Sequence, residues 1–441
     1  MIDKLKILWH YTKTKHLLKF KDRQQLLEWQ EKQIQNFLRS VLPKSPFYTE
    51  FFADLSIKDW RSLPAIDKSI MMNNFDKLNT VGINKEEAFN IALKAEQTRN
   101  FSPMINDVTV GLSSGTSGNR GIFLVSPEER LKWAGTILAK LLPDSIFSKN
   151  KIAFFLRANS NVYTTVSSRN INFEFFDLLN PINEHIERLN KYQPSVLVAP
   201  SSMLRFLAQA SESHKLTINP IKIISVAEVL DKLDEIYISM QFNQKVHQIY
   251  QCTEGFLAAT CRHGTLHINE DMVVIQKEYL DKDLGKFMPI ITDFSRTTQP
   301  IIRYKLNDIL TERKEPCPCG SHFIAIEKIE GRCDDIFYLS AKNSSQLKPL
   351  FPDFISRAII FSSELIEEYK VIQKTSTELE VYLKLPAQIN NSERKLAQDL
   401  VNNSLIKLCN KFEVEIPTIS FTEEIIYIKG KKLKRIESLV K

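Results

Sequence analysis

The densest cluster of glycine and hydroxyl side chains lies at Ser113–Gly121, which reads S-S-G-T-S-G-N-R-G. The chain has only 12 glycines, and four of them, Gly111, Gly115, Gly118 and Gly121, fall close together here. Glycine lets backbone N–H groups turn inward around an anion, and the Ser and Thr hydroxyls add donors for phosphate oxygens. The Walker pattern G-x-x-x-x-G-K-[ST] is absent from the chain. The stretch therefore predicts a phosphate-binding loop of another kind, and a plain Ser/Gly surface loop is the alternative.

A second polar cluster follows the apolar run Val246–Tyr250. The hexapeptide Tyr250–Gly255 reads Y-Q-C-T-E-G, and α/β folds bind ligands at the carboxyl ends of their strands. There Glu254 could hold Mg²⁺, Thr253 could bond a phosphate and the Tyr250 ring could stack on a base. By itself the hexapeptide is a weak signal.

A third cluster, R-Y-K-L-N-D at residues 303–308, combines an arginine with an acid. Arg303 is suited to phosphate and Asp308 to ribose hydroxyls. A solvated charged loop is the alternative interpretation.

Three cysteines and a histidine offer soft ligands for a structural Zn²⁺. The candidates are Cys261, His267, Cys317 and Cys319. The C-x-C spacing is tighter than the usual C-x₂₋₄-C, and His263 and His322 compete as ligands. Reduced cysteines in a turn are the alternative, because a cytosolic chain of this length with six cysteines does not suggest a disulfide framework.

The elements that must position these residues alternate between apolar runs and helical patterns. A helix is predicted over residues 22–42, and the first 98 residues are expected to be mostly helical. Short apolar runs separated by helical stretches predict parallel strands with helical crossovers, hence an α/β fold. From about Leu257 the pattern becomes strand-rich, and a distinct tail follows residues 331–335. The predicted strands are 152–156, 195–199, 221–226, 246–250, 379–385 and 424–428, and the predicted crossover helices are 184–192 and 203–213.

Composition predicts a soluble cytoplasmic protein of more than one domain. The chain has 441 residues, 43% hydrophobic and 25% charged, with no apolar run long enough to span a membrane and no signal-peptide core. No nucleic-acid motif accompanies the net charge of +7. The basic N-terminal 44 residues carry apolar side chains such as Leu5 and Trp9, so peripheral contact with anionic lipid is an alternative to a solvated helix face.

Taken in chain order, these motifs resemble the adenylate-forming superfamily of acyl-CoA synthetases and adenylation domains. More narrowly, they are similar to its phenylacetate–CoA ligase and CoF synthetase branch. The matching segments are S-S-G-T-S-G (113–118), V-A-E (226–228), Y-x-x-T-E-G (250–255), L-H-I-N-E-D (266–271), I-R-Y-K-L-N-D (302–308), G-R-C-D-D (331–335) and K-K-L-K-R (431–435). The resemblance implies a large adenylation domain over 1–333 and a small mobile α+β domain over 334–441, rotating at a hinge near Asp334.

The resemblance also implies the site residues. Phosphates and Mg²⁺ would be bound by Ser113, Ser114, Gly115, Thr116, Ser117, Gly118, Thr253 and Glu254. Adenine would be framed by Ala227, Glu228 and Tyr250, and the ribose held by Asp308 with support from Arg332. The catalytic lysine of the family lies three residues before an arginine, which selects Lys432 with Arg435. Lys431 competes, because the preceding glycine is shifted to position 430.

Two departures from the family pattern stand out. The loop shows Asn119-Arg120 where a lysine is usual, so Arg120 is expected to supply the charge. Asp334-Asp335 is followed by I-F-Y-L-S-A-K, without the arginine–glycine pair of ligases in this branch. The second departure weakens the assignment of coenzyme A as the acceptor, and it affects the assignment of adenylation less.

The expected activity is ATP-dependent adenylation of an aromatic or fatty carboxylic acid, followed by transfer to a thiol, either coenzyme A or a carrier protein. A CoF synthetase-like enzyme that places AMP on a deazaflavin hydroxyl is the alternative, and an inactive nucleotide-binding or membrane-associated scaffold is another. A homodimer is one possible oligomeric state. Five phenylalanines, Phe154, Phe155, Phe173, Phe175 and Phe176, lie near where this family builds its acid pocket, and core packing is the other explanation for them.

Overall fold

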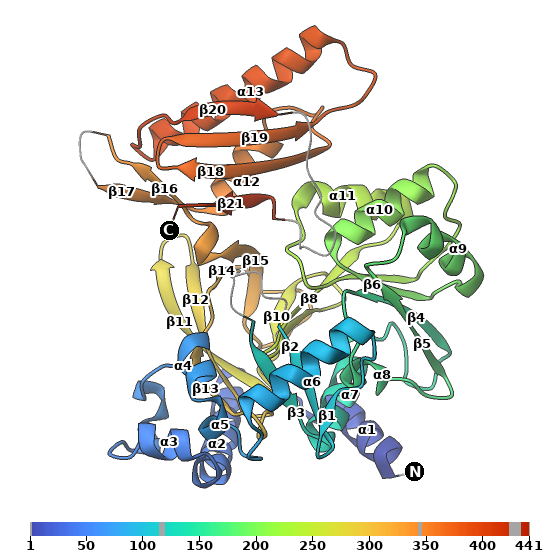
Figure 1. Cartoon of the computed structure of the whole chain (residues 1–441), viewed down its shortest axis with the longest axis vertical. Coiled ribbons are helices and arrows are strands. Elements are labelled where there is room, and N and C mark those ends of the chain that lie inside the picture. The colour runs from blue at the N-terminus through green and yellow to red at the C-terminus, as the bar shows by residue number, and fades with distance from the viewer. Residues whose placement is uncertain (1, 114–119, 343–345, 423–433, 441) are drawn as a thin grey trace. The chain divides into compact units, whose positions relative to one another are not determined.

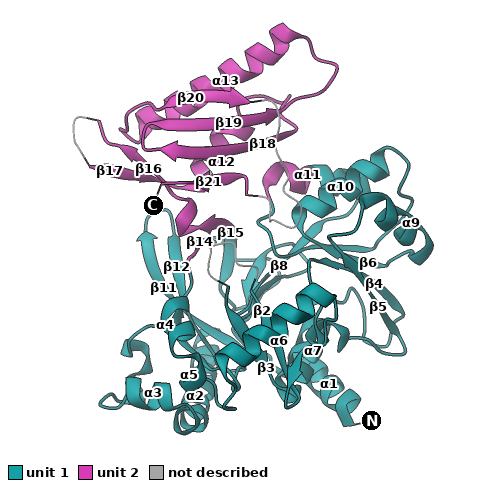
Figure 2. Cartoon of the chain, viewed as in Figure 1, with its two compact units in different colours: residues 1–230, 237–306, 311–328 teal, residues 231–236, 307–310, 329–441 magenta. Residues whose placement is uncertain are grey.

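The computed structural model describes residues 2–113, 120–342, 346–422 and 434–440. The chain forms two compact units (Figure 2). Unit 1 comprises Met1–Leu230, Tyr237–Leu306 and Thr311–Lys328, and unit 2 comprises Asp231–Ile236, Asn307–Leu310 and Ile329–Lys441. The predicted domain boundary at residue 333 and the predicted hinge at Asp334 stay predictions.

The first 98 residues of unit 1 are largely helical. The predicted helix over 22–42 is α2, Arg23–Val41, which begins where the Asp22 side chain accepts a hydrogen bond from the backbone N–H of Gln25 at 2.8 Å. Its apolar stripe, including Leu26, Ile34 and Leu38, is fully buried. The other helical elements are α1 (Ile2–Thr12), a π-helical turn (Lys13–Leu17), 3₁₀ turns (Leu42–Lys44 and Ile57–Ser62), α3 (Pro46–Phe51), α4 (Lys68–Asn73), α5 (Phe75–Leu78) and α6 (Lys85–Thr98).

A three-stranded antiparallel sheet carries the glycine-rich loop. Its strands are β1 (Met104–Ile105), β2 (Val108–Leu112) and β3 (Ile122–Val125). The loop joins β2 to β3, so its two ends are fixed by strand pairing between Leu112 and Ile122.

The large sheet is parallel in the order β5-β4-β6-β7-β8, which confirms the predicted α/β fold (Figure 1). Four of its strands match predicted ones, and β5 was not predicted. The strands are β4 (Asn150–Leu156), β5 (Ile171–Asp177), β6 (Val196–Ala199), β7 (Lys222–Ser225) and β8 (Val246–Cys252). The helices between β3 and β8 are α7 (Pro127–Leu141), α8 (Asn161–Thr164), α9 (Ile182–Tyr192), α10 (Ser201–Glu212) and α11 (Lys232–Phe242).

Alternate residues of these parallel strands point to opposite faces, and each face has its own core. Phe155, Leu197 and Ile223 pack with α9, α10 and the later part of α11. Ile152, Val198 and Ile224 pack with α7. Both faces are apolar, as expected for strands buried on both sides.

Beyond β8 the sheet becomes antiparallel, which agrees with the predicted change near Leu257. Its full order is β11-β12-β14-β15-β10-β9-β8-β7-β6-β4-β5, with β13 paired to β12. The added strands are β9 (Gly255–Thr260), β10 (Leu266–Ile268), β11 (Val273–Asp281), β12 (Lys286–Asp293), β13 (Ile301–Lys305), β14 (Asp308–Glu312) and β15 (Ala325–Arg332).

Unit 2 is an α+β unit, built around the sheet β20-β19-β18-β21. The predicted strand at 379–385 is β19, whereas the predicted strand at 424–428 lies outside the described residues. Apolar residues of β18 and β19, such as Val371 and Val381, pack with Val401 of the long helix α13. The elements are a 3₁₀ turn (Cys333–Asp335), β16 (Phe337–Ser340), β17 (Leu347–Leu350), α12 (Pro352–Ile360), β18 (Glu368–Thr375), β19 (Glu378–Lys384), α13 (Asn391–Lys411), β20 (Thr418–Thr422) and β21 (Ile436–Ser438).

The N-terminal helix α1 packs on α7 through Ile7 and Tyr11. Its other side leaves Ile2, Leu5 and Trp9 more than half exposed. In the part of the chain that the structure describes, no helix is both long and apolar enough to cross a membrane.

Candidate active site

The ends of the glycine-rich loop are held together by a short hydrogen-bond network. The backbone N–H of Ser113 donates to the carbonyl of Gly121 at 2.8 Å, and the N–H of Gly121 donates to Ser113 Oγ at 2.7 Å. The loop residues between them, Ser114, Gly115, Thr116, Ser117, Gly118 and Asn119, lie outside the described residues.

Arg120 has an acidic partner within unit 1. Its Nη2 donates to Glu96 Oε1 of α6 at 2.5 Å, and its Nε donates to the Ser113 carbonyl at 3.3 Å. Glu96 also accepts a hydrogen bond from Arg157 at 3.1 Å. The guanidinium of Arg120 is thus directed at α6.

The turn between β8 and β9 holds the predicted acid. Glu254 is buried, with 8% of its surface exposed. One carboxylate oxygen accepts from Thr253 Oγ1 at 2.9 Å, and the other accepts from Tyr304 Oη at 2.9 Å. Burial and the neighbouring Glu254 carboxylate raise the pKa of Tyr304 far above its usual value, so the phenol keeps its proton. Tyr304 lies inside the predicted R-Y-K-L-N-D motif, but its role was missed.

Two further residues support this turn and were also missed. Asp293, at the end of β12, lies against Gly255, where an added Cβ would be only 2.7 Å from Asp293 Oδ2. Burial raises the pKa of Asp293, opposed by its hydrogen bonds with Ser295. Arg296 donates to the carbonyls of Thr253 and Leu124, each at 3.0 Å. A polar residue ending an apolar strand, as at Asp293, was the available sequence signal.

Arg303 is positioned differently from its neighbour Tyr304. Its backbone is left-handed, with φ of 46°, and its side-chain neighbour is Asp59, whose charge acts against the lowering of the Arg303 pKa by burial. Among the described residues, Nε and Nη1 of Arg303 have no hydrogen-bond partner. The structure therefore does not pair Arg303 with Glu254.

The predicted adenine-framing segment is a tight turn after β7. The N–H of Glu228 donates to the carbonyl of Val226 at 2.8 Å, and Ala227 between them has a φ of 65°. Such a three-residue turn at a non-glycine residue is strained, and strain of this kind is common at functional sites. The Glu228 carboxylate accepts from the N–H of Ser202 at 3.0 Å, so its side chain caps the start of α10.

A cavity of about 70 Å³ lies between α7 and the strands β4 to β8. Nearly all of its lining is apolar, and four aromatic rings border it: Trp133, Phe154, Tyr163 and Phe173. Ile249, the residue before Tyr250 on β8, also lines it. Of the five phenylalanines singled out in the sequence, only Phe154 and Phe173 reach the cavity. Phe155 and Phe176 belong to the opposite face, and Phe175 packs against Phe101.

Unit 2 brings several of its predicted residues together. Asp308 and Arg332 form an ion pair at 3.8 Å, and Asp334 accepts from Asn307 at 3.1 Å. Arg435 makes two hydrogen bonds to the Asp234 carboxylate, at 2.8 and 3.0 Å. Lys431 and Lys432 lie outside the described residues.

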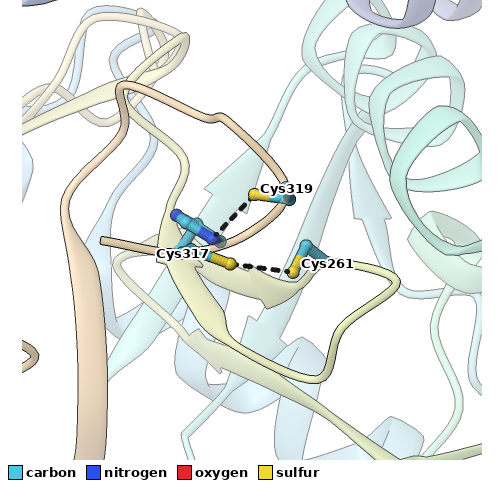
Figure 3. Close-up of side chains that lie close together, drawn as sticks. Cys261, Cys317 and Cys319 are labelled. Carbon is cyan, nitrogen blue, oxygen red and sulfur yellow. Dashed lines mark hydrogen bonds between the residues drawn. The ribbon is translucent and has the colours of Figure 1, made fainter. Parts of the chain in front are cut away.

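The four predicted zinc ligands converge in unit 1, with their ligand atoms all within 4.8 Å of one another. Figure 3 shows the three cysteine side chains pointing toward each other. Cys261 Sγ lies 3.7 Å from Cys317 Sγ, and Cys319 Sγ lies 3.4 Å from His267 Nε2. Neither of the competing histidines belongs to this cluster.

The surroundings of the cluster suit a metal. His267 Nδ1 lies 3.2 Å from the carbonyl of Phe323, which leaves Nε2 facing the cysteines. Burial acts to raise the pKa of Cys317, but hydrogen bonds from Thr265 and from the backbone of Cys319 outweigh it and lower the pKa. Three cysteine sulfurs and an imidazole nitrogen form a donor set that structural Zn²⁺ sites commonly use.

The structure was compared with solved structures of other proteins. The chain has the fold of acid–CoA ligases and related adenylate-forming enzymes, which agrees with the fold that the resemblance implies, whereas the narrower phenylacetate–CoA ligase and CoF synthetase branch stays a prediction. A 2-hydroxyisobutyryl-CoA ligase, solved in the postadenylation state with R3-HIB-AMP, matches with a TM-score of 0.69 and 13% identity, over 94% of this chain and 89% of that one.

Two curated proteins are related in sequence. Protein CapK of Staphylococcus aureus is 24% identical over 408 residues, which cover 89% of this chain and 85% of that protein. The phenylacetate-coenzyme A ligase of Thermus thermophilus is 22% identical over 156 residues, which cover 33% of this chain and 32% of the ligase. No protein-family model matches the sequence.

Proposed function

We propose that the chain is an AMP-forming carboxylate ligase. In the first step a substrate carboxylate attacks the α-phosphorus of ATP, forming the acyl-AMP and releasing pyrophosphate. In the second step a thiol attacks the acyl carbon, forming a thioester and releasing AMP and a proton. The fold shared with acyl-CoA ligases and the ordered motifs support both steps.

The observation that carries the proposal is the turn at Thr253–Glu254 and its relation to the apolar cavity. Ile249 of β8 lines the cavity, and the buried Glu254 lies in the turn that follows this strand. We infer that the apolar part of the acid fills the cavity and that its carboxylate is directed toward the phosphates that a metal at Glu254 would hold, as in-line attack on the α-phosphorus requires.

Glu254 fits a Mg²⁺ ligand. Within the residues that the structure describes, each of its two oxygens accepts one hydrogen bond, which leaves a lone pair on each for a hard cation. Mg²⁺ would neutralise charge on the phosphates as pyrophosphate leaves. Tyr304, protonated and donating, holds the carboxylate in one orientation. Lys432 is proposed as the lysine that stabilises the transition state.

The cavity favours an apolar or aromatic acid of modest size. Aromatic rings that border an apolar space accept an aryl or branched alkyl group, and they offer little to a polar one. Coenzyme A or a carrier protein would accept the acyl group, whereas in the CoF synthetase-like alternative a deazaflavin hydroxyl would accept AMP, and the assay below separates the two reactions.

The test is pyrophosphate release with a panel of aryl and short alkyl acids, with and without coenzyme A. We expect release with at least one apolar acid, and Glu254→Gln to lower it by about 100-fold or more, the scale on which removing one charge-stabilising group acts. Glu50→Gln is the control, since Glu50 is exposed and pairs with Lys77 on the surface. Release without thioester would point to another acceptor, and no release with any acid or deazaflavin would contradict the proposal and favour the scaffold.

We also propose that Cys261, His267, Cys317 and Cys319 hold a structural Zn²⁺ that ties the β9–β10 turn to the loop before β15. Elemental analysis of protein purified without chelator should give about one zinc per chain, and Cys317→Ser should lower both the zinc content and the thermal midpoint. Cys409→Ser is the control for zinc content alone, because Cys409 lies outside the cluster and its burial in the core of unit 2 would itself make the serine destabilising. Less than half an equivalent of zinc in the unmodified protein would count against the site.

A further inference from the structure

The N-terminal helix α1 carries an exposed apolar stripe. Figure 1 shows α1 at the edge of unit 1, next to α7. Ile7 and Tyr11 pack on the core beside α7. Ile2, Leu5 and Trp9 follow one another at intervals of three and four residues, so they share a different face of the helix, and they are 69%, 62% and 56% exposed. Large apolar side chains aligned in this way on a helix surface indicate a face that receives a partner.

Basic residues accompany the stripe. Before Asp22, which caps α2, the chain holds six lysines and one acid, Asp3. The side chain of Lys6 pairs with Glu128 of α7. Lys19 and Lys21 are exposed. The six lysines are Lys4, Lys6, Lys13, Lys15, Lys19 and Lys21.

The loop between α7 and β4 adjoins this segment. The N–H of Ile146 donates to Tyr11 Oη at 3.2 Å, and the Lys15 ammonium group donates to the Asp144 carbonyl at 2.8 Å. Phe147, the residue after Ile146, is 70% exposed. The loop therefore adds an exposed aromatic ring next to the basic segment.

Further cations lie near Lys15, at the starts of two parallel strands. Burial and the charge of Lys15 lower the pKa of Lys222, the first residue of β7, to about 8. Burial and the charges of Lys222 and Lys245 lower the pKa of His247, on β8, to about 4. Like charges held this close repel one another, and an anionic surface against them would reduce the repulsion.

We propose that α1 and the adjoining basic residues form a docking surface for a bilayer that contains anionic phospholipids. The apolar stripe would enter the boundary between headgroups and acyl chains, where tryptophan is favoured, and the lysines would lie against the headgroup phosphates. A second copy of the chain fits less well, because a symmetric interface would bring two basic surfaces together. A nucleic acid duplex would neutralise the lysines but leave the apolar stripe in water.

This inference does not depend on the proposed function. Lys222 begins β7, whereas Glu254 follows the end of β8, which runs parallel to β7. The basic cluster and the candidate active site therefore lie at opposite edges of the parallel strands. A bilayer at the first edge would leave the second accessible to substrates.

The test is co-sedimentation of the full chain with vesicles of phosphatidylcholine, alone or mixed with phosphatidylglycerol. We expect binding to the mixed vesicles that weakens as salt is added, and little binding to phosphatidylcholine alone. Trp9→Ala should lower the partition coefficient for the mixed vesicles by about 10-fold or more, because the indole no longer enters the bilayer. The double variant Lys19→Glu/Lys21→Glu should lower it by a similar factor, because two attractive charges become repulsive.

Matched controls come from unit 2. Phe361→Ala removes another aromatic ring, which is 80% exposed, and Lys395→Glu/Lys407→Glu reverses two exposed charges on α13. Both controls should bind the mixed vesicles within about twofold of the unmodified protein, which is within the scatter of surface substitutions. Should Trp9→Ala alter the circular dichroism spectrum, Leu5→Gln tests the same stripe.

Three results would overturn the inference. The first is no binding of the folded protein to mixed vesicles at low salt, and the second is equal binding by the parent and by folded Trp9→Ala and Leu5→Gln variants. The third is a dimer, detected by sedimentation velocity, that Trp9→Ala dissociates while vesicles stay unbound, because the stripe would then be a self-association surface. Pyrophosphate release by Trp9→Ala with soluble substrates should equal that of the parent, so loss of vesicle binding is distinguishable from loss of the proposed activity.

Discussion

The two faces of the parallel strands in unit 1 differ in how completely they are filled. On the face toward α9 and α10, Phe155 stacks on Phe176 with ring centroids 4.6 Å apart, and the His185 ring meets Phe155 edge-on at 5.1 Å. On the face toward α7, Phe154 and Phe173 tilt against each other at 5.3 Å and border the cavity. Phe155 and Phe154, adjacent residues of β4, thus face a packed core and a core with a cavity, respectively.

The difference has an energetic meaning. A void in a protein core destabilises the fold by about 24 cal/mol per Å³, so a cavity of about 70 Å³ corresponds to about 2 kcal/mol. This cost is consistent with the proposal that the space on the face toward α7 receives the apolar part of a substrate.

The largest expected effect contrasts Phe155 with Phe154. Phe155→Ala should destabilise unit 1 by about 3–5 kcal/mol, because the ring is fully buried and its neighbours cannot collapse into the space. Phe154→Ala should cost less than about 2 kcal/mol, since its ring already borders a void. Urea unfolding followed by circular dichroism measures both. Equal losses for the two variants would mean that the faces do not differ in packing.

Filling the cavity should separate stability from activity. Val198 lines the cavity, and Val198→Phe should leave the thermal midpoint unchanged or higher while lowering kcat/KM for the preferred acid by about 10-fold or more. Leu197→Phe, one residue away on the packed face, is the matched variant and should destabilise by about 1–3 kcal/mol through overpacking. Full activity in a folded Val198→Phe protein would contradict the assignment of the cavity as the acid-binding pocket.

The sequence predicts most of the parallel strands of this sheet, but it does not predict how closely the side chains pack on each face. Apolar runs separated by helical patterns predict β4, β6, β7 and β8, because that signal depends only on local periodicity. The contrast between Phe154 and Phe155 is invisible in the same run, since both residues are equally apolar and the face that closes depends on α7 and α9. The strand β5 was missed because the charged Glu174 interrupts its apolar pattern.

Prediction of the site residues from the sequence is limited in the same way, because it depends on contacts between distant parts of the chain. Cys261, His267, Cys317 and Cys319 could be proposed from residue type alone, and the structure brings those four together rather than either competing histidine. The role of Tyr304 could not be assigned, because its position depends on the bridge between Ile66 and Tyr304, residues far apart in the chain. Arg120 was expected to face phosphate, but nothing in the loop sequence reveals the partner that α6 supplies.

The smallest expected effect concerns His185, the one histidine within the aromatic stack of the packed face. It is fully buried, and among the described residues neither ring nitrogen makes a hydrogen bond of good geometry. Burial, aided by Arg188, lowers its pKa from 6.5, while the Glu184 carboxylate and the backbone and carboxylate of Asp177 act in the opposite direction. Because the unfolded chain then binds more protons below pH 6.5, this group's contribution to stability falls as the pH drops from 6.5 toward the lowered native pKa.

His185→Leu should therefore stabilise unit 1 by about 1 kcal/mol at pH 7.5, by removing unmet polar atoms at similar volume, and by more at pH 5.5. Thermal midpoints of variant and parent at the two pH values give the difference directly. His16→Leu, at an exposed position, should show no such growth. A constant difference between pH 7.5 and 5.5, or a less stable His185→Leu protein, would mean that the imidazole is hydrogen-bonded and that the packed face is less apolar than its rings indicate.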